Sequence, residues 1–243
     1  MRFTPKVPFG RNLLRPGGVR FDVEAPQIFQ SHERLKSVLS DVANAANLLW
    51  NAASVQARFE GTGTVSREQA ASLGLVAPSA CASGVERDIR QDFPTGIFRS
   101  ARLPIFTWKT GDVYSRANIL WLEIQQSVAF IQNQLTTLPN GPICADSGPL
   151  HPNYLAVSLV EGWRGEICHC ALTDAQGKFS RYKIVDPSFH NWMGLAMSLR
   201  EQQISDAYQA PDVPRSPKST PLGFLPAETT FDNYLTPLVD AKP

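Results

Sequence analysis

Apolar side chains recur every three or four positions in two long stretches of the chain, which is the spacing of one face of an α-helix. The first stretch covers residues 31–59, with charged and polar positions between the apolar ones. The second covers residues 111–138 and ends where Pro139-Asn140-Gly141-Pro142 interrupts the pattern. Each stretch predicts a long amphipathic helix.

The apolar period falls to two after residue 150, as in strands with one buried face. This alternation predicts strands over Leu155–Val160, Glu166–Leu172 and Phe179–Val185, with a turn over Thr173–Lys178. Helical spacing returns over residues 189–200. The pattern therefore predicts an α+β fold that is mainly α-helical, with two long amphipathic helices and a small antiparallel β-hairpin region.

The segment between the two long helices contains one clear helix signal and many helix breakers. Ser66 and Gln69 have the spacing of a capping box, which predicts a short helix that stops at Gly74. Residues 75–108 are interrupted by proline and glycine, at Pro78, Gly84, Pro94, Gly96 and Pro104. We therefore expect residues 75–108 to be irregular.

Proline distinguishes the two ends of the chain from its middle. Residues 1–26 hold four of the 19 prolines, and residues 207–243 hold seven. Because proline fixes φ and lacks a backbone N–H, neither end can form a continuous helix or a central strand. We expect an extended arm over residues 1–26, a folded domain over 27–206, and a disordered tail over 207–243.

The near balance of charge excludes one class of partner. Lys and Arg number 23 against 22 Asp and Glu, whereas nucleic-acid-binding proteins usually carry a basic surplus. No apolar run approaches the roughly 20 residues of a membrane-spanning helix, and the first residues lack the apolar core of a signal peptide. We therefore expect a cytoplasmic protein with reduced cysteines, no nucleic-acid partner and no direct membrane span.

Five short motifs, in order, resemble one protein family. Arg15–Val19, Ser83–Arg90 and Gly111–Arg116 resemble the large subunit shared by nickel-iron hydrogenases and respiratory NADH:quinone oxidoreductase (complex I). Glu161–Glu166 and Ser188–Trp192 look closer to the formate-hydrogenlyase and hydrogenase-4 branch. The resemblance runs from about residue 8 to Asp206 and corresponds to the C-terminal half of the family.

The resemblance implies an oxidoreductase subunit that acts in electron transfer to quinone or protons. Its reaction class would be oxidation of NAD(P)H with a quinone acceptor, or hydrogenase-type chemistry. The partners implied are a small iron-sulfur subunit and membrane-arm subunits, which would hold the chain at the cytoplasmic membrane. Quinone, NAD(H) and iron-sulfur clusters would be bound by other subunits, with no cofactor expected on this chain.

The chain also departs from the family pattern. The two Cys-x-x-Cys pairs that hold nickel and iron in the hydrogenases are absent, and those metals need soft thiolate ligands. Cys81 stands where the family usually has an arginine, and Leu120 stands where the long helix has another. Losing a guanidinium leaves a partner carboxylate unpaired unless that partner has changed too. Two alternatives follow: a non-catalytic scaffold or assembly subunit that docks an iron-sulfur partner, or a truncated remnant.

Charged residues of the matching motifs are the candidate functional residues. By resemblance, Arg164, Glu166 and Asp206 are candidates for catalysis, although no catalytic residue is assigned. The resemblance also implies an interface or proton route lined by charged residues, namely Arg87, Asp88, Arg90, Asp112 and Arg116.

Simpler structural interpretations exist for each of these residues. Arg164 could bridge Glu161 and Glu166, either beside a redox site or as a structural ion pair. The charge run over residues 85–92 is more typical of a solvated loop, and Asp112 and Arg116 have the i,i+4 spacing of a helix side-chain pair.

Two further motifs bear on cofactors. Cys144, His151 and His190 would have to converge on Cys168-His169-Cys170 to complete a zinc site, and small buried thiols are the simpler interpretation. No Gly-x-Gly-x-x-Gly follows a predicted strand, so the sequence does not support direct dinucleotide binding.

Overall fold

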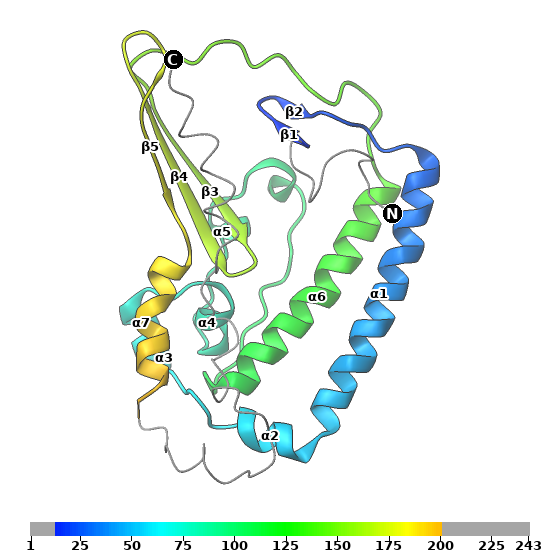
Figure 1. The fold of residues 1–243 in the computed structure, drawn as a ribbon, viewed down its shortest axis with the longest axis vertical. Coiled ribbons are helices and arrows are strands. Elements are labelled where there is room, and N and C mark those ends of the chain that lie inside the picture. Colours follow the sequence, from blue (N-terminus) through cyan, green and yellow to red (C-terminus); the bar gives the residue numbers. More distant parts are fainter. Residues whose placement is uncertain (1–12, 201–243) are drawn as a thin grey trace, which may run out of the picture. The chain divides into compact units, whose positions relative to one another are not determined.

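The computed structural model describes residues 13–200, which form two compact units. The first unit comprises residues 13–48, 124–155 and 171–181, and the second comprises residues 49–123, 156–170 and 182–200. Helices combine with two small antiparallel sheets (Figure 1), which confirms the α+β class. The predicted tail over 207–243 and the candidate Asp206 lie outside the described residues.

The first predicted helix differs from the observed helices at its start and in its middle. Helix α1 spans Ala25–Asn51 and α2 spans Ala53–Phe59, whereas one helix over residues 31–59 was expected. Pro26 fits in the first turn of α1 because the first N–H groups of a helix have no helical partner. The break falls at Ala52, whose extended backbone (φ −87°, ψ 107°) ends the helical path.

The second long helix is confirmed almost at its predicted bounds. Helix α6 spans Val113–Thr136. Its first turn is capped by Asp112, whose Oδ1 accepts the Ser115 N–H at 2.8 Å. None of the helices within residues 13–200 is long and apolar enough to cross a membrane.

A short hairpin orders the N-terminal arm where the structure describes it. Strands β1 (Leu14–Arg15) and β2 (Gly18–Val19) pair antiparallel, and Gly18 also bridges to Cys144. Gly17 has φ +89°, and a Cβ there would lie 2.1 Å from the carbonyl oxygen of Ala145. The turn therefore requires glycine at this position.

The three predicted strands form one sheet. Strands β3 (Leu155–Gly162), β4 (Gly165–Thr173) and β5 (Phe179–Val185) lie in that order and run alongside one another (Figure 1). In the predicted turn, Asp174 Oδ1 accepts the amides of Gln176 and Lys178, both at 2.9 Å. Helix α7 (Ser188–Ser198) follows β5.

The capping box predicted a helix correctly. Helix α3 spans Arg67–Leu73, and the Gln69 N–H donates to Ser66 Oγ at 3.2 Å. In return, the Ser66 N–H donates to Gln69 Oε1 at 3.0 Å. Gly74 ends α3 in the left-handed conformation, as expected of a helix C-terminus.

Residues 75–108 contain more regular structure than their prolines and glycines predicted. Helices α4 (Ala77–Ala82) and α5 (Ile89–Asp92) and the 3-10 helix η2 (Gly96–Arg99) lie within this segment. The interpretation of residues 75–108 as irregular was therefore wrong in part. Pro78 does not break α4 because it occupies the first turn, where its missing N–H is not needed.

The apolar core of the second unit gathers around α3 and α4. Val65, Ala70, Leu75 and Ala80 are buried together, and Leu195 of α7 packs against them. This core fixes the position of α4, which leads into the loop before α5.

The buried Asn191 of α7 links two backbone segments. Its Oδ1 accepts the Val76 N–H at 3.1 Å, and its Nδ2 donates to the Arg164 carbonyl at 3.2 Å. The second contact holds the turn between β3 and β4 to α7. That turn carries Arg164, and Glu161 and Glu166 lie on the strands on either side of it, β3 and β4.

Candidate functional site

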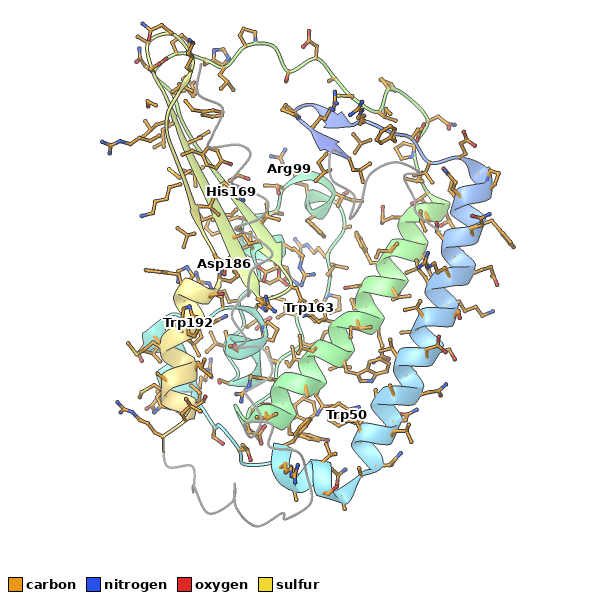
Figure 2. The ribbon with its side chains drawn as sticks, viewed as in Figure 1. Trp50, Arg99, Trp163, His169, Asp186 and Trp192 are labelled. Carbon is orange, nitrogen blue, oxygen red and sulfur yellow. The ribbon has the colours of Figure 1, made fainter. Side chains whose placement is uncertain are left out.

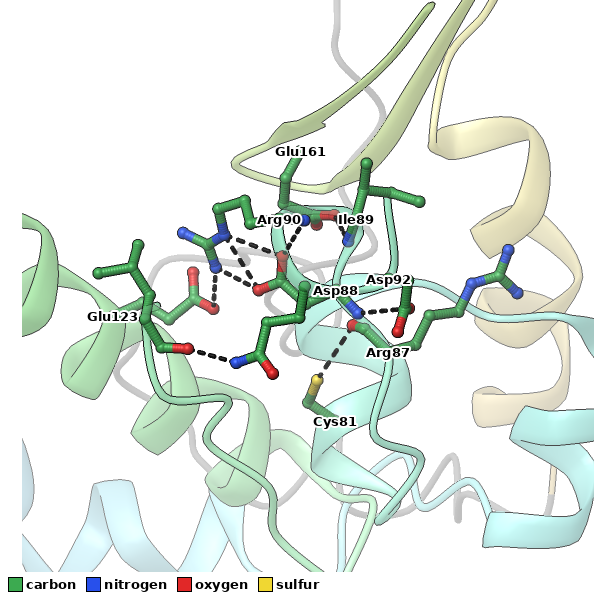
Figure 3. A network of polar contacts seen from close by, with 10 residues as sticks. Cys81, Arg87, Asp88, Ile89, Arg90, Asp92, Glu123 and Glu161 are labelled. Atoms are coloured by element: carbon green, nitrogen blue, oxygen red, sulfur yellow. Dashed lines mark hydrogen bonds and ion pairs between the residues drawn. The ribbon is translucent and has the colours of Figure 1, made fainter. Parts of the chain in front are cut away.

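Six charged side chains of the second unit form two groups and are together called the charged cluster below: Asp88, Arg90, Glu123 and Glu161 in one, and the pair Arg87 and Glu166 in the other. They come from the loop before α5, from α5 itself, from α6 and from the hairpin of β3 and β4. Figure 3 labels five of them, Arg87, Asp88, Arg90, Glu123 and Glu161. The sequence interpretation of residues 85–92 as a solvated loop is wrong for Asp88, which is only 4% exposed.

Asp88 and Arg90 form the most closely bonded pair of the charged cluster. Arg90 Nε donates to Asp88 Oδ1 at 2.9 Å and to Oδ2 at 3.0 Å, and Nη2 lies 2.5 Å from Oδ2. Asp88 also caps α5 by accepting the Arg90 N–H at 2.8 Å. The hydrogen bonds to Asp88 raise the pKa of Arg90, so its positive charge is fixed.

Glu123 shares the same guanidinium at a longer distance. Its Oε1 lies 3.6 Å from Arg90 Nη2. Burial raises the pKa of Glu123, and Asp88 adds to the rise while Arg90 opposes it. Sequence reasoning missed Glu123, although it is the single acidic residue in the 24 residues of α6. A lone carboxylate in a helix with so little charge is the signal that could have identified it.

Glu161 occupies a different environment from the other carboxylates. Its Oε2 accepts the Ile89 N–H at 3.0 Å. Within the described part of the chain, no Lys, Arg or His lies within 4.0 Å of the Glu161 carboxylate. Burial raises the pKa of Glu161 to about 7; Asp88 and Glu123 add to the rise, whereas Ile89 and Arg90 oppose it.

Glu166 pairs with Arg87, which corrects the expected bridge. Arg87 Nη2 donates to both carboxylate oxygens, at 2.9 and 2.8 Å, and His190 Nε2 lies 3.7 Å from Oε1. The sequence suggested Arg164 as the partner of Glu166 and Glu161. Arg164 instead contributes its backbone carbonyl to the hydrogen bond from Asn191.

Cys81 lies beneath the charged cluster. It is 4% exposed, and its thiol donates to the Arg87 carbonyl with an Sγ to O distance of 3.9 Å. Burial raises the pKa of Cys81 to about 12, and the nearby charges of Glu123, Asp88 and Glu161 add to the effect. A neutral thiol, on which three carboxylates act electrostatically, therefore occupies the position where the family resemblance implies an arginine.

Asp112 and Arg116 are buried and connect the start of α6 to the segment that follows α2. Asp112 Oδ2 accepts the Gly61 N–H at 3.0 Å, and Arg116 donates to the carbonyls of Gly111 and Gly63 at 2.7 and 3.1 Å. Burial alone would raise the pKa of Asp112, but hydrogen bonds from Ser115, Gly61 and Thr110 outweigh it and lower the pKa. Burial lowers the pKa of Arg116 to about 10. The structure thus gives both residues a bracing role at the start of α6.

The candidate zinc motif lies on β4. His169 is labelled in Figure 2. Its Nδ1 is 2.8 Å from the Tyr182 hydroxyl of β5. Across residues 13–200, no three His, Cys, Asp or Glu side chains are arranged to hold a metal ion.

Comparison with known proteins places the chain among subunits of redox enzymes. Residues 9–155 match the family described as "Respiratory-chain NADH dehydrogenase, 49 Kd subunit". The chain is 27% identical to hydrogenase-4 component G of Escherichia coli over 199 residues, which are 82% of the chain and 33% of that protein. It is 31% identical to an NADH-quinone oxidoreductase subunit of Clostridium beijerinckii over 186 residues, 74% and 49% of the two chains.

A third relative is named as a hydrogenase. The carbon monoxide-induced hydrogenase of Rhodospirillum rubrum is 28% identical over 213 residues, which are 85% of this chain and 58% of the relative. The chain thus spans between a third and somewhat over half the length of these relatives.

Proposed function

Because the chain belongs to the family of the 49 Kd subunit of respiratory-chain NADH dehydrogenase, we propose that it acts in electron transfer to quinone or protons within a membrane-associated oxidoreductase complex. The names of its relatives support both acceptors, since one is an NADH-quinone oxidoreductase subunit and another is a hydrogenase. The proposed partners are a small iron-sulfur subunit and membrane-arm subunits. They would hold the chain on the cytoplasmic side of the membrane and bind NAD(H), quinone and the iron-sulfur clusters.

The charged cluster is the observation that carries this proposal. Reduction of a quinone to a quinol and reduction of protons to hydrogen both consume one proton for each electron. A subunit beside either reaction therefore benefits from groups that exchange protons near neutral pH. The cluster combines such a group, Glu161, with a fixed ion pair between Asp88 and Arg90.

Within this proposal each part of the cluster has a distinct role. Arg90 stays protonated and holds Asp88 and Glu123 near it by charge. Arg87 and Glu166 fix the hairpin of β3 and β4 to the loop before α5. The resulting frame keeps the exchanging carboxyl at one position relative to its neighbours.

Isolation of the intact assembly tests the proposal. A tagged chain extracted from its native membranes in mild detergent should co-purify with an iron-sulfur subunit in stoichiometric amount. The assembly should reduce quinone or evolve hydrogen. Glu123→Gln, which removes one cluster charge with little change in shape, should lower turnover at least about tenfold without loss of partners.

The matched control is Glu33→Gln, which changes an exposed carboxylate of α1. This variant should assemble and turn over like the parent. Recovery of the chain without redox partners, or equal turnover for Glu123→Gln and the parent, would contradict the proposal.

A second candidate function, a scaffold that docks an iron-sulfur partner, is favoured by the surface of α1. Among its described residues only Ser31 is buried. Phe29 and Leu48 are 69% and 76% exposed. A scaffold would co-purify with the same partners, but Glu123→Gln would leave turnover of the assembly unchanged. A truncated remnant would instead aggregate or be rapidly proteolysed when produced alone.

A further inference from the structure

Negative charges outnumber positive charges around Glu161. Glu161, Asp88 and Glu123 contribute three carboxylates to this part of the charged cluster, and Arg90 contributes one guanidinium. Arg90 is already occupied, since its Nε and Nη2 bind both oxygens of Asp88 and its Nη2 also faces Glu123. Among the residues that the structure describes, Glu161 is therefore the carboxylate of this group without a close positive partner, and a partly buried negative charge in that position favours protonation.

The groups around Glu161 come from several elements. Asp88 and Arg90 belong to the α5 region, and Glu123 belongs to α6. The same three carboxylates act electrostatically on Cys81 of α4, and its thiol stays neutral at physiological pH because burial raises its pKa to about 12. On the next strand of the hairpin, Glu166 pairs with Arg87 and lies 3.7 Å from His190 Nε2. Arg90 is the one positive charge among these groups that acts on Glu161, and the two acidic neighbours oppose it.

Glu161 also makes a structural connection. Its Oε2 accepts the N–H of Ile89, the first residue of α5, across 72 positions of the chain. The Ile89 side chain is buried, so water does not readily replace the carboxylate as acceptor. An ionised carboxylate is a stronger acceptor than a neutral carboxylic acid. Protonation of Glu161 therefore weakens the connection between β3 and α5.

We propose that Glu161 is the proton-exchanging residue of the charged cluster and that its ionisation controls how firmly β3 is tied to α5. The reaction is the release of one proton from the Glu161 carboxylic acid to solvent, which leaves a carboxylate and breaks no other covalent bond. The use of this proton in electron transfer rests on the proposed function. The titration itself is a property of this chain.

A carboxyl titration of the isolated full chain tests the inference. With glutamate labelled at the side-chain carboxyl carbon, NMR spectra across pH should show one glutamate that titrates near neutrality. Glu161→Gln should remove this signal, whereas Glu33→Gln should retain it. Glu123→Gln should shift the midpoint to lower pH, because it removes a negative neighbour.

A second measurement distinguishes a proton switch from a purely structural acceptor. The hydrogen-exchange protection of the Ile89 amide, corrected for its intrinsic rate, should increase about threefold or more as pH rises through the midpoint. This dependence should be absent in Glu161→Gln. A parent chain in which every glutamate titrates in the ordinary acidic range would overturn the inference, as would a neutral titration that persists in Glu161→Gln.

Failure of this inference and failure of the proposed function are distinguishable. If Glu161 titrates as expected but the native assembly transfers no electrons, only the proposed function fails. If the assembly is active but Glu161 titrates as an ordinary acid, only the present inference fails.

Discussion

Arg87 and Glu166 are 79 positions apart in the chain, yet Nη2 of Arg87 contacts both carboxylate oxygens of Glu166 at 2.8 and 2.9 Å. The arginine is 40% exposed and the glutamate 12% exposed. The pair thus joins the loop before α5 to the start of β4 at the edge of the charged cluster. It acts together with the hydrogen bonds from Asn191 to the Arg164 carbonyl and from the Ile89 N–H to Glu161, which also hold the hairpin.

Removal of Arg87 should destabilise the second unit. Arg87→Ala leaves the mostly buried Glu166 carboxylate without its main donor, which we expect to cost about 2 kcal/mol in the free energy of unfolding. Urea denaturation of Arg87→Ala, Glu166→Gln and the double variant measures the coupling between the two side chains. Additive effects in this cycle would show that the contact does not contribute to stability.

Replacement of Gly165 should be far more costly than replacement of Gly74. Both have positive φ, +132° and +67°, but a Cβ at Gly165 would lie 2.4 Å from Val76 Cγ2, whereas nothing lies within 4 Å at Gly74. Gly165→Ala should cost about 3–5 kcal/mol, and Gly74→Ala about 1 kcal/mol. Thermal unfolding of both variants tests the contrast, and equal losses would mean that steric overlap at Gly165 is relieved elsewhere.

The four cysteines should differ in reactivity. Cys81 is buried with its pKa raised to about 12, whereas Cys144 is exposed. At pH 8, iodoacetamide should modify Cys144 at least about a hundredfold faster than Cys81, since the thiolate is the nucleophile. Mass spectrometry of quenched samples measures both rates. Unfolding in urea should remove the difference, and rapid modification of Cys81 in the folded chain would place its thiol outside the core.

Unfolding should respond to pH with opposite signs at Glu161 and Asp112. The folded-state pKa of Glu161 is raised from 4.5 to about 7, so the folded chain binds more protons than the unfolded chain in this window. Stability from this group is present below about pH 4.5 and is lost as pH rises through about 7, by about 1–3 kcal/mol. The free energy of global unfolding should therefore be lower at pH 8 than at about pH 5.5, although ionised Glu161 accepts the Ile89 N–H more strongly within the folded chain. Glu161→Gln should reduce this slope. An unchanged slope in the variant would contradict the expectation.

For Asp112 the folded-state pKa is lowered. Its contribution is present above the ordinary value of 3.8 and is lost as pH falls through the folded-state pKa. Asp112→Asn should cost about 1–2 kcal/mol near neutral pH, and its difference from the parent should shrink on acidification. Urea midpoints of the two chains at several pH values provide the measurement. If the stability difference between the parent and Asp112→Asn grew on acidification, the pKa of Asp112 would be raised in the folded chain and the prediction would be wrong.

Local signals in the sequence predicted the regular elements well. The apolar spacing over residues 111–138 corresponds to α6, and the capping box of Ser66 and Gln69 is formed as expected. Such features depend on neighbours within about one helical turn or on the alternation of a strand. The structure departs from the sequence interpretation where prolines and glycines occupy permitted positions, as Pro78 does in α4.

The charged cluster could be predicted only in part. The loop residues Arg87, Asp88 and Arg90 were identified by resemblance, but their burial was not. The partner of Glu166 was misassigned to Arg164 because that residue is close in sequence, whereas Arg87 reaches Glu166 only through the fold. Such long-range pairs depend on how the hairpin packs against α5. The spacing of apolar residues along the sequence contains no information about that packing.

The hydrogen bond between Val76 and Asn191 spans 115 positions. Since a chain is synthesised from its N-terminus, the Val76 N–H cannot form this hydrogen bond until α7 has been synthesised. Of the helices that form this core, α7 is therefore the last to be synthesised and to pack against the others. A nascent chain released before residue 191 would expose the surface that α7 covers, and would be a natural target for chaperones and proteases.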